Sequence, residues 1–121
     1  MLQRLLKKME LSQNTQEKIK KLQEYEHKIQ ALNLQRQRLD AQISEIDSAL
    51  NALGDKNSGE AYKIIGNVMV SASRDKLQEE LKEKKKKVEL RIKSIEKQQE
   101  QLKQVAEAIQ KEVLKQIGRK E

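Results

Sequence analysis

The sequence predicts a mostly helical protein: two long helices form an antiparallel coiled coil, and one β-hairpin between them joins hairpins of other subunits in an intersubunit β-barrel. Three observations support this fold class. Only 36% of the 121 residues are hydrophobic, which is little for a globular core, proline is absent, and one β-prone stretch, YKIIGNVMVS, interrupts a Leu/Lys/Glu/Gln-rich chain. We divide this single domain, residues 1–121, into a first helix (1–53), a linker and hairpin (54–73) and a second helix (74–118).

The first helix is predicted from a heptad repeat over residues 22–53. Apolar or aromatic side chains return at alternating steps of three and four, with a single charged interruption. These positions are Leu22, Tyr25, Ile29, Leu32, Arg36, Leu39, Ile43, Ile46, Leu50 and Leu53. Gly54 follows directly, and we expect it to end the helix by taking a positive φ.

The second helix is expected to begin at Ser73, whose hydroxyl can cap a free backbone N–H group. Asp75 then lies in the first turn, where a negative charge suits the helix dipole, and Gly118 marks the end. Apolar residues continue along one stripe between these limits. They are Leu77, Leu81, Val88, Ile95, Leu102, Val105, Ile109, Val113 and Ile117.

An antiparallel pairing of the two helices requires that facing residues have position numbers with a constant sum. A sum of 127 opposes Leu50 with Leu77, Ile46 with Leu81, Leu39 with Val88, Leu32 with Ile95, Tyr25 with Leu102 and Leu22 with Val105. The same sum gives weak layers of Arg36 with Arg91, Ile43 with Lys84 and Ile29 with Gln98, and Ile92 beside Arg91 indicates a local change of register. We prefer this hairpin to a parallel dimer of separate helices.

Residues 62–71 predict a β-hairpin, because Gly66-Asn67 separates two β-prone runs and a two-residue loop with Gly first suits a type II′ turn. The pairing places Tyr62, Ile64 and Met69 on one face and Ile65, Val68 and Val70 on the other. A lone two-stranded hairpin is marginal in water, so we expect these residues to pair with strands of other subunits. The alternative is that this stretch extends a helix, which Gly66-Asn67 and the β-branched residues disfavour.

The order of these elements resembles the beta-type subunit of the prefoldin family over essentially the whole chain. The most specific similarity is Tyr62-Lys63, then Gly66 and a short apolar strand that leads directly into a Lys/Glu-rich helix, as in AYKIIGNVMVSASRDKLQEEL followed by RIKSIEKQQEQL. Alpha-type members carry two hairpins between the helices. Residues 54–73 leave room for one, which indicates the beta type.

The resemblance implies a cytoplasmic hexamer of two alpha-type and four beta-type subunits, in which the hairpins form two β-barrels and the coiled coils project. It implies an ATP-independent chaperone without a cofactor. The tips of the coiled coils hold unfolded client proteins and pass them to a group II chaperonin.

Two apolar clusters at the ends of the helices furthest from the hairpin support this role independently. They consist of Leu2, Leu5, Leu6 and Met9 in the first helix and of Val113, Leu114 and Ile117 in the second. Residues 12–18 are almost wholly polar and partly detach the clusters from the stripe. The clusters can bind clients as exposed apolar patches, or they can meet each other and close the coiled coil. Both interpretations stay open.

The net charge of +7 and four consecutive lysines at positions 84–87 indicate a competing function, in which the chain contacts nucleic acid or an anionic membrane. Glutamates surround these lysines and no recognition motif is present, so a solvated helix face with ion pairs is the preferred interpretation. We therefore expect no membrane contact and no nucleic acid partner. The alternative function is a structural or adaptor coiled coil, for instance in a nucleic-acid-associated complex.

Catalysis has little support in this composition. His27 is the single histidine and is expected on the surface, and the absence of cysteine excludes disulfides and thiolate metal sites. No Gly-rich phosphate loop, signal peptide or membrane-length apolar run is present. We expect a soluble cytoplasmic protein that is not an enzyme and binds no metal or cofactor.

Overall fold

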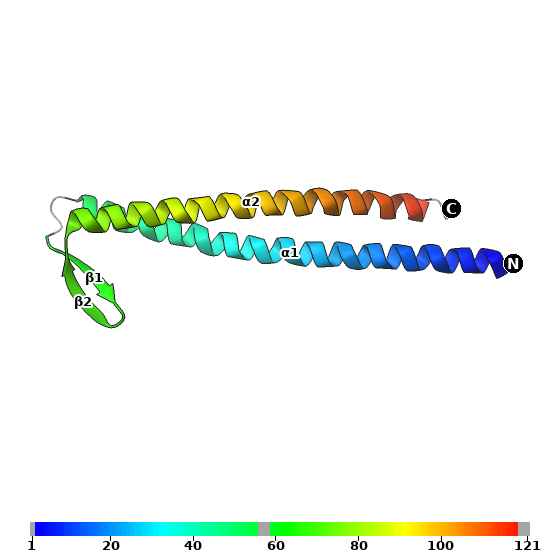
Figure 1. Cartoon of the computed structure of the whole chain (residues 1–121), viewed down its shortest axis with the longest axis horizontal. Coiled ribbons are helices and arrows are strands. Elements are labelled where there is room, and N and C mark those ends of the chain that lie inside the picture. The colour runs from blue at the N-terminus through cyan, green and yellow to red at the C-terminus, as the bar shows by residue number, and fades with distance from the viewer. Residues whose placement is uncertain (1, 56–58, 119–121) are drawn as a thin grey trace. The chain divides into compact units, whose positions relative to one another are not determined.

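Two long helices and one hairpin make up the described chain (Figure 1). The computed structural model describes residues 2–55 and 59–118, with side chains described for Leu2 and from Gln13 onward within these ranges. The elements follow one another as α1 (Leu2–Gly54), β1 (Ala61–Ile65), β2 (Val68–Ala72) and α2 (Arg74–Gly118). This order confirms the predicted mostly helical fold with a hairpin between the helices.

At the helix ends next to the hairpin, the predicted start of α2 is confirmed and the predicted conformation of Gly54 at the end of α1 is wrong. The Ser73 carbonyl accepts a hydrogen bond from the Leu77 N–H at 3.0 Å, so Ser73 lies at the cap position before α2, and Asp75 lies in the first turn. Gly54, however, does not take a positive φ. The Asp55 N–H instead reaches back to the Ala52 carbonyl at 3.4 Å, and this tight turn ends α1 without a left-handed residue.

The chain divides into two compact units, each built from a segment of α1 and a segment of α2. Of the described residues, the first unit contains 2–34 and 96–118, and the second unit contains 35–95, including the hairpin. Within each unit the two helix segments lie side by side and run in opposite directions (Figure 1). The antiparallel pairing is therefore correct, and each unit is considered on its own below.

Each helix buries one stripe, which we call the seam. In α1, every residue reached by alternating steps of three and four from Thr15 to Leu53 is buried or half-buried, and these include all ten positions predicted over residues 22–53. In α2, the same spacing runs from Gln78 to Gln116. The apolar side chains with the lowest exposure are Ile46 (5%), Val88 (8%), Ile95 (4%) and Val113 (6%).

The register of the seam differs from the predicted one by about one helical turn. Three side-chain contacts that cross it join residues whose numbers add up to about 131: Thr15 with Gln116, Lys18 with Glu112, and Asp47 with Lys85. The longer Gln99 side chain also donates to the Ile29 carbonyl at 3.4 Å, with a sum of 128. With a sum of 131, every seam position of α1 from Thr15 to Leu53 falls opposite a buried or half-buried position of α2. The predicted sum of 127 is therefore wrong.

The heptad explains this difference. A heptad has two kinds of seam position: position a, which is followed by a step of three residues, and position d, which is followed by a step of four. In an antiparallel pair, an a position on one helix faces a d position on the other. The sum of 127 instead placed d positions opposite d positions, as in Ile46 with Leu81. It placed the a positions of α1 opposite residues outside the seam of α2, as in Ile43 with Lys84. In the observed register Ile43 faces Val88 instead of Lys84, and Arg36 faces Ile95 instead of Arg91. Val105, predicted in the seam, is 44% exposed because Ala106 takes that position.

Lys85, in the run of four lysines, occupies a seam position of the second unit. Its Nζ lies 2.7 Å from the Asp47 Oδ1 across the seam, and this hydrogen bond raises the pKa of Lys85 above its ordinary value. The flanking lysines Lys84, Lys86 and Lys87 are exposed. The run therefore wraps around the helix and does not form a single basic face.

The hairpin follows its predicted geometry. β1 and β2 are antiparallel, with Ile65 opposite Val68 on either side of the two-residue turn. Gly66 has a φ of 61° and Asn67 does not have a positive φ, as a type II′ turn requires. The register places Ile64 opposite Met69, so the two predicted faces are correct.

We predict that the seam of the second unit provides most of its stability. Ile95→Ala should lower the free energy of unfolding by about 2–4 kcal/mol, because it leaves a cavity at a side chain that is 4% exposed. Leu90→Ala, on the same helix but 66% exposed, should change it by less than about 0.5 kcal/mol. Chemical denaturation followed by circular dichroism checks both values, and equal losses would contradict the assigned seam.

Candidate functional site

Exposed apolar side chains lie on both helices towards the end of the first unit. Leu114 is 61% exposed and Ile117 is 51% exposed, and we call these two residues the terminal apolar pair. Leu2, at the start of α1, is 76% exposed. The other predicted members of the first cluster, Leu5, Leu6 and Met9, belong to α1, but their side chains lie outside the described residues.

The first turns of α1 extend past the described part of α2. In the observed register Gly118, the last described residue of α2, faces position 13 of α1. Residues 2–12 of α1 therefore have no facing residue in the described part of α2, in agreement with the high exposure of Leu2. The Leu2 side chain therefore lies outside the described seam.

The second predicted cluster is divided between the seam and the surface. Val113 lies in the seam and is 6% exposed, so its side chain contributes to helix pairing. Leu114 and Ile117 each follow a seam residue by one position, which turns them about 100° away from the seam. The terminal apolar pair is thus on the surface because the seam is already complete beside it.

Polar contacts complete the seam at this end of the first unit. The Thr15 hydroxyl, on a residue only 7% exposed, donates to Gln116 Oε1 at 2.9 Å. Lys18 Nζ lies 3.2 Å from Glu112 Oε2. A buried hydroxyl with a partner avoids the cost of about 1–3 kcal/mol of an unsatisfied polar group. These layers hold the helices together without the terminal apolar pair.

Sequence reasoning missed these polar layers because it followed apolar residues only. The signal was present, since a step of four back from Leu22 reaches Lys18 and a further step of three reaches Thr15. Residues 12–18 are therefore not a break between the seam and the cluster. They continue the seam with polar side chains.

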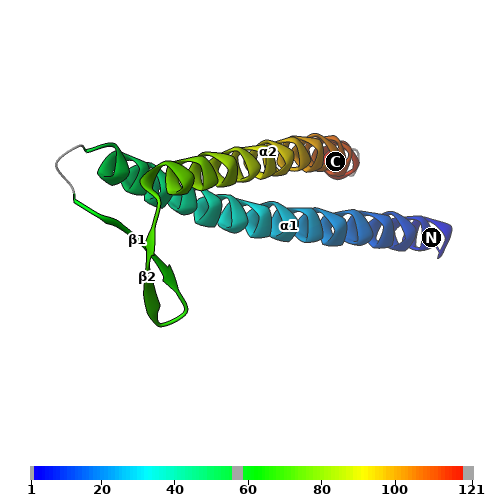
Figure 2. The same cartoon turned by 60° about the vertical axis from the view of Figure 1, so that its left-hand side comes forward.

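Figure 2 shows the two strands of the hairpin, which belongs to the second unit. This hairpin carries a second exposed apolar surface. Its large apolar residues are all more than 40% exposed, and the described sheet has only two strands. They are Tyr62 (51%), Ile64 (69%), Ile65 (60%), Val68 (62%), Met69 (64%) and Val70 (42%). Together with the turn residue Gly66, these are the residues predicted to assemble subunits. Two unpaired strand edges and two apolar faces can accept further strands.

Polar contacts join α2 to the hairpin and to the residues that precede it. Lys63 Nζ lies 3.1 Å from Glu80 Oε2, and the Arg74 guanidinium donates to the Asp55 carbonyl at 3.2 Å and to the Gly59 carbonyl. A groove of about 550 Å³ lies between hairpin and helices, with Tyr62 and Ile64 on one side and Leu53, Leu77 and Leu81 on the other. One face of the hairpin thus borders the groove, and the apolar residues of both faces stay more than 40% exposed.

Other chemistries find little support in the described part of the chain. His27 is exposed, as predicted. Within residues 2–55 and 59–118 no group of three or more histidine, aspartate or glutamate side chains is arranged to hold a metal ion. None of the described helices has a segment both long and apolar enough to cross a membrane.

Comparison with known proteins gives one consistent result. The family model described as "Prefoldin subunit" matches residues 16–120. The chain is 33% identical over 96 residues to the prefoldin subunit beta of Archaeoglobus fulgidus, covering 78% of this chain and 83% of that protein. It is 28% identical over 106 residues to the prefoldin subunit beta of Pyrobaculum arsenaticum, covering 86% and 85%.

The fold comparison agrees with the sequence comparison. The crystal structure of the prefoldin beta subunit from Thermococcus strain KS-1 matches with a TM-score of 0.77 and 25% sequence identity. The match covers 83% of this chain and 89% of that chain. The shared architecture is two long helices with a hairpin between them.

We predict that Glu60 controls the ionisation of Tyr62 on the hairpin. The Tyr62 hydroxyl donates to Glu60 Oε2 at 2.7 Å, and this bond raises the pKa of Tyr62 above 10.0. Because the pKa of Tyr62 is higher in the folded than in the unfolded protein, this hydrogen bond stabilises the fold below the unfolded pKa. That stabilisation is lost as the pH rises through the folded pKa. Glu60→Ala should therefore lower the pKa of Tyr62. Ultraviolet titration in a Tyr25→Phe background measures it, and an unchanged value would contradict the bond.

Proposed function

We propose a chaperone function for this chain, which belongs to the prefoldin subunit family as a subunit of the beta type. The family consists of non-enzymatic chaperone subunits. In our proposal the chain acts as an ATP-independent holdase. It captures unfolded polypeptides on apolar surface at the end of the coiled coil and delivers them to a group II chaperonin in the cytoplasm.

The observation that carries this proposal is the exposure of Leu114 and Ile117 beside a seam that Val113 and a Thr15–Gln116 hydrogen bond complete. Apolar side chains that do not stabilise the helix pair are available to a ligand. Leucine and isoleucine make non-directional contacts, so such a surface does not select one client sequence. Leu2, Leu5, Leu6 and Met9 are proposed to add to the client surface from the extension of α1.

Assembly is proposed to occur through the hairpin. Both of its faces and both of its edges are open in the single chain, and a two-stranded sheet is marginal by itself. We propose that hairpins of further copies and of alpha-type subunits complete β-barrels in a hexamer of two alpha-type and four beta-type subunits. Several client surfaces in one complex would then bind one client, so weak single contacts give a strong total.

We predict that the double variant Leu114→Gln/Ile117→Gln loses most of its ability to hold clients. Removing two apolar contacts of about 1 kcal/mol each should weaken client binding at least tenfold. Suppression of light scattering from a chemically unfolded client, diluted without nucleotide into the protein assembled with alpha-type subunits, measures this. The same assay applied to a deletion of residues 1–10 and 112–121 should show a complete loss.

The matched control is Leu34→Gln/Leu90→Gln, because these leucines are 54% and 66% exposed and lie away from the ends of the helices. This control should hold clients as the unaltered protein does. The point variants are more informative than the deletion, which also removes the seam residues Val113 and Gln116. If the assembled double variant holds clients fully, the terminal apolar pair is not the site. If the unaltered assembly holds nothing, an adaptor role replaces the chaperone proposal.

We predict that Ile64→Asp/Val68→Asp prevents assembly, because it places a carboxylate on each apolar face of the hairpin. The helices should form as before, since neither residue contributes to the seam. Native mass spectrometry should show a single chain where the unaltered protein forms a complex with alpha-type subunits. An unchanged oligomeric mass would contradict the assignment of the hairpin.

A further inference from the structure

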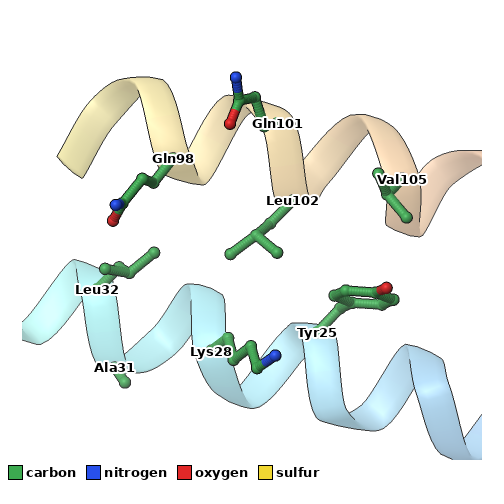
Figure 3. Close-up of a pocket in the computed structure, with 8 residues that line it drawn as sticks. All are labelled: Tyr25, Lys28, Ala31, Leu32, Gln98, Gln101, Leu102 and Val105. Carbon is green, nitrogen blue, oxygen red and sulfur yellow. The ribbon is translucent and has the colours of Figure 1, made fainter. Parts of the chain in front are cut away.

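A second apolar depression lies in the first unit, away from the terminal apolar pair (Figure 3). This shaft groove measures about 560 Å³ and is lined by Tyr25 and Leu32 of α1 and by Leu102 and Val105 of α2. Leu102 points between Leu32 and Tyr25, and Val105 lies over the tyrosine side (Figure 3). The volume is within the range of about 300–1,000 Å³ that is usual for sites of small ligands.

The shaft groove and the terminal apolar pair are on opposite sides of the coiled coil. Lys28 and Val105, which line the groove, each precede a seam residue by one position. Leu114 and Ile117 each follow a seam residue by one position. Since successive helical residues turn by about 100°, the two sets face away from each other across the seam. The groove is thus a separate surface, and its residues can be altered without changing the terminal apolar pair.

The polar groups of the groove select its ligand. Among the described residues that line it, Lys28 is the only charged one, and none is a carboxylate. The Lys28 ammonium is 5.8 Å from the centroid of the Tyr25 ring, which holds the positive charge over the apolar wall. Among the described residues Lys28 has no ion-pair partner, although Glu24 lies one turn before it on α1. The Gln98 side chain adds an amide, which can donate to and accept from a peptide backbone.

The length of the groove limits the ligand further. From Tyr25 to Leu32 the helix rises by about 10 Å, at roughly 1.5 Å per residue. An extended peptide covers this distance with about three residues, at roughly 3.3 Å each. The site therefore fits a short extended segment with apolar side chains against Leu32, Leu102 and Val105, and with a negative charge at Lys28.

We infer that the shaft groove binds a short extended segment of a client in which apolar residues adjoin an aspartate or glutamate. This inference rests on the proposed chaperone function and adds a client class to it. The terminal apolar pair accepts apolar segments of any charge, while the shaft groove prefers those that carry a carboxylate. A client that passes around the coiled coil contacts both surfaces.

The test uses two acetylated and amidated hexapeptides, Gly-Leu-Val-Leu-Asp-Gly and the same sequence with lysine in place of aspartate. Each is titrated into the full-length chain with labelled methyl groups, and the NMR signals of Leu102 and Val105 report the groove. The aspartate peptide should shift these signals and bind about threefold more tightly than the lysine peptide, as expected for one exposed ion pair. Lys28→Gln should remove this preference, whereas Lys20→Gln, outside the groove, should keep it.

A second pair of variants tests the apolar part of the groove. Val105→Gln should weaken both peptides about fivefold, and Leu34→Gln, on the same unit but outside the groove, should leave both affinities unchanged. Holding of an unfolded client by the terminal apolar pair should survive Val105→Gln in large part. This result separates the groove from the proposed function.

Three results would overturn the inference while the chaperone proposal stands. In the first, the peptides shift the methyl signals of Leu114 and Ile117 but not those of Leu102 and Val105. In the second, both peptides bind the groove equally. In the third, the groove signals shift with protein concentration alone, which would assign the groove to a second copy of the chain. If the peptides shift no signal and the assembled protein holds no client, both proposals fail.

Discussion

The seam is the constraint on which the rest of this structure depends. Each helix can bury only one stripe, and among the side chains that the structure describes only Ile46, Val88, Ile95 and Val113 are apolar and buried. With so little full burial, stability requires that each seam position faces another, which a register sum of about 131 achieves along both units. The hairpin residues do not belong to the seam, so their apolar side chains stay exposed and available to partners.

The sequence predicted the stripes well and their alignment poorly, for a physical reason. Heptad spacing follows from local periodicity, and it placed all ten positions of α1 over residues 22–53 correctly. The register of α1 against α2 depends on which residues of the two helices face each other. A repetitive leucine-rich stripe packs almost as well when one helix is shifted by one turn along the other. The predicted register required Ile43 to face Lys84, and that mismatch was the available sign of an error. A requirement that both kinds of heptad position find partners would have favoured the observed register.

Local signals also explain which details of the candidate sites could be predicted. The hairpin turn depends on Gly66 alone taking a positive φ, so two residues were enough to predict it. Val113 lies in the seam and Leu114 on the surface, and the spacing predicts this difference. A step of four from the seam residue Ile109 reaches Val113 and not Leu114. Polar seam residues such as Thr15 and Lys85 were missed because an apolar pattern does not reveal them. Their partners, Gln116 and Asp47, lie on the facing helix, and only the correct register brings them together.

The polar layers near the end of the first unit connect stability with the proposed function. A hydrogen bond such as that between Thr15 and Gln116 contributes roughly 0.5–1.5 kcal/mol, less than the burial of a leucine pair would. The seam is therefore weaker there, but it closes without recruiting Leu114 and Ile117. If leucines replaced the polar layers, the gain in seam stability would favour burial of neighbouring apolar residues and alternative registers one turn away. Polar layers oppose both, because a shifted register would separate the buried Thr15 hydroxyl from Gln116. The same side chains thus fix the alignment of the helices and keep the terminal apolar pair on the surface, where a client can reach it.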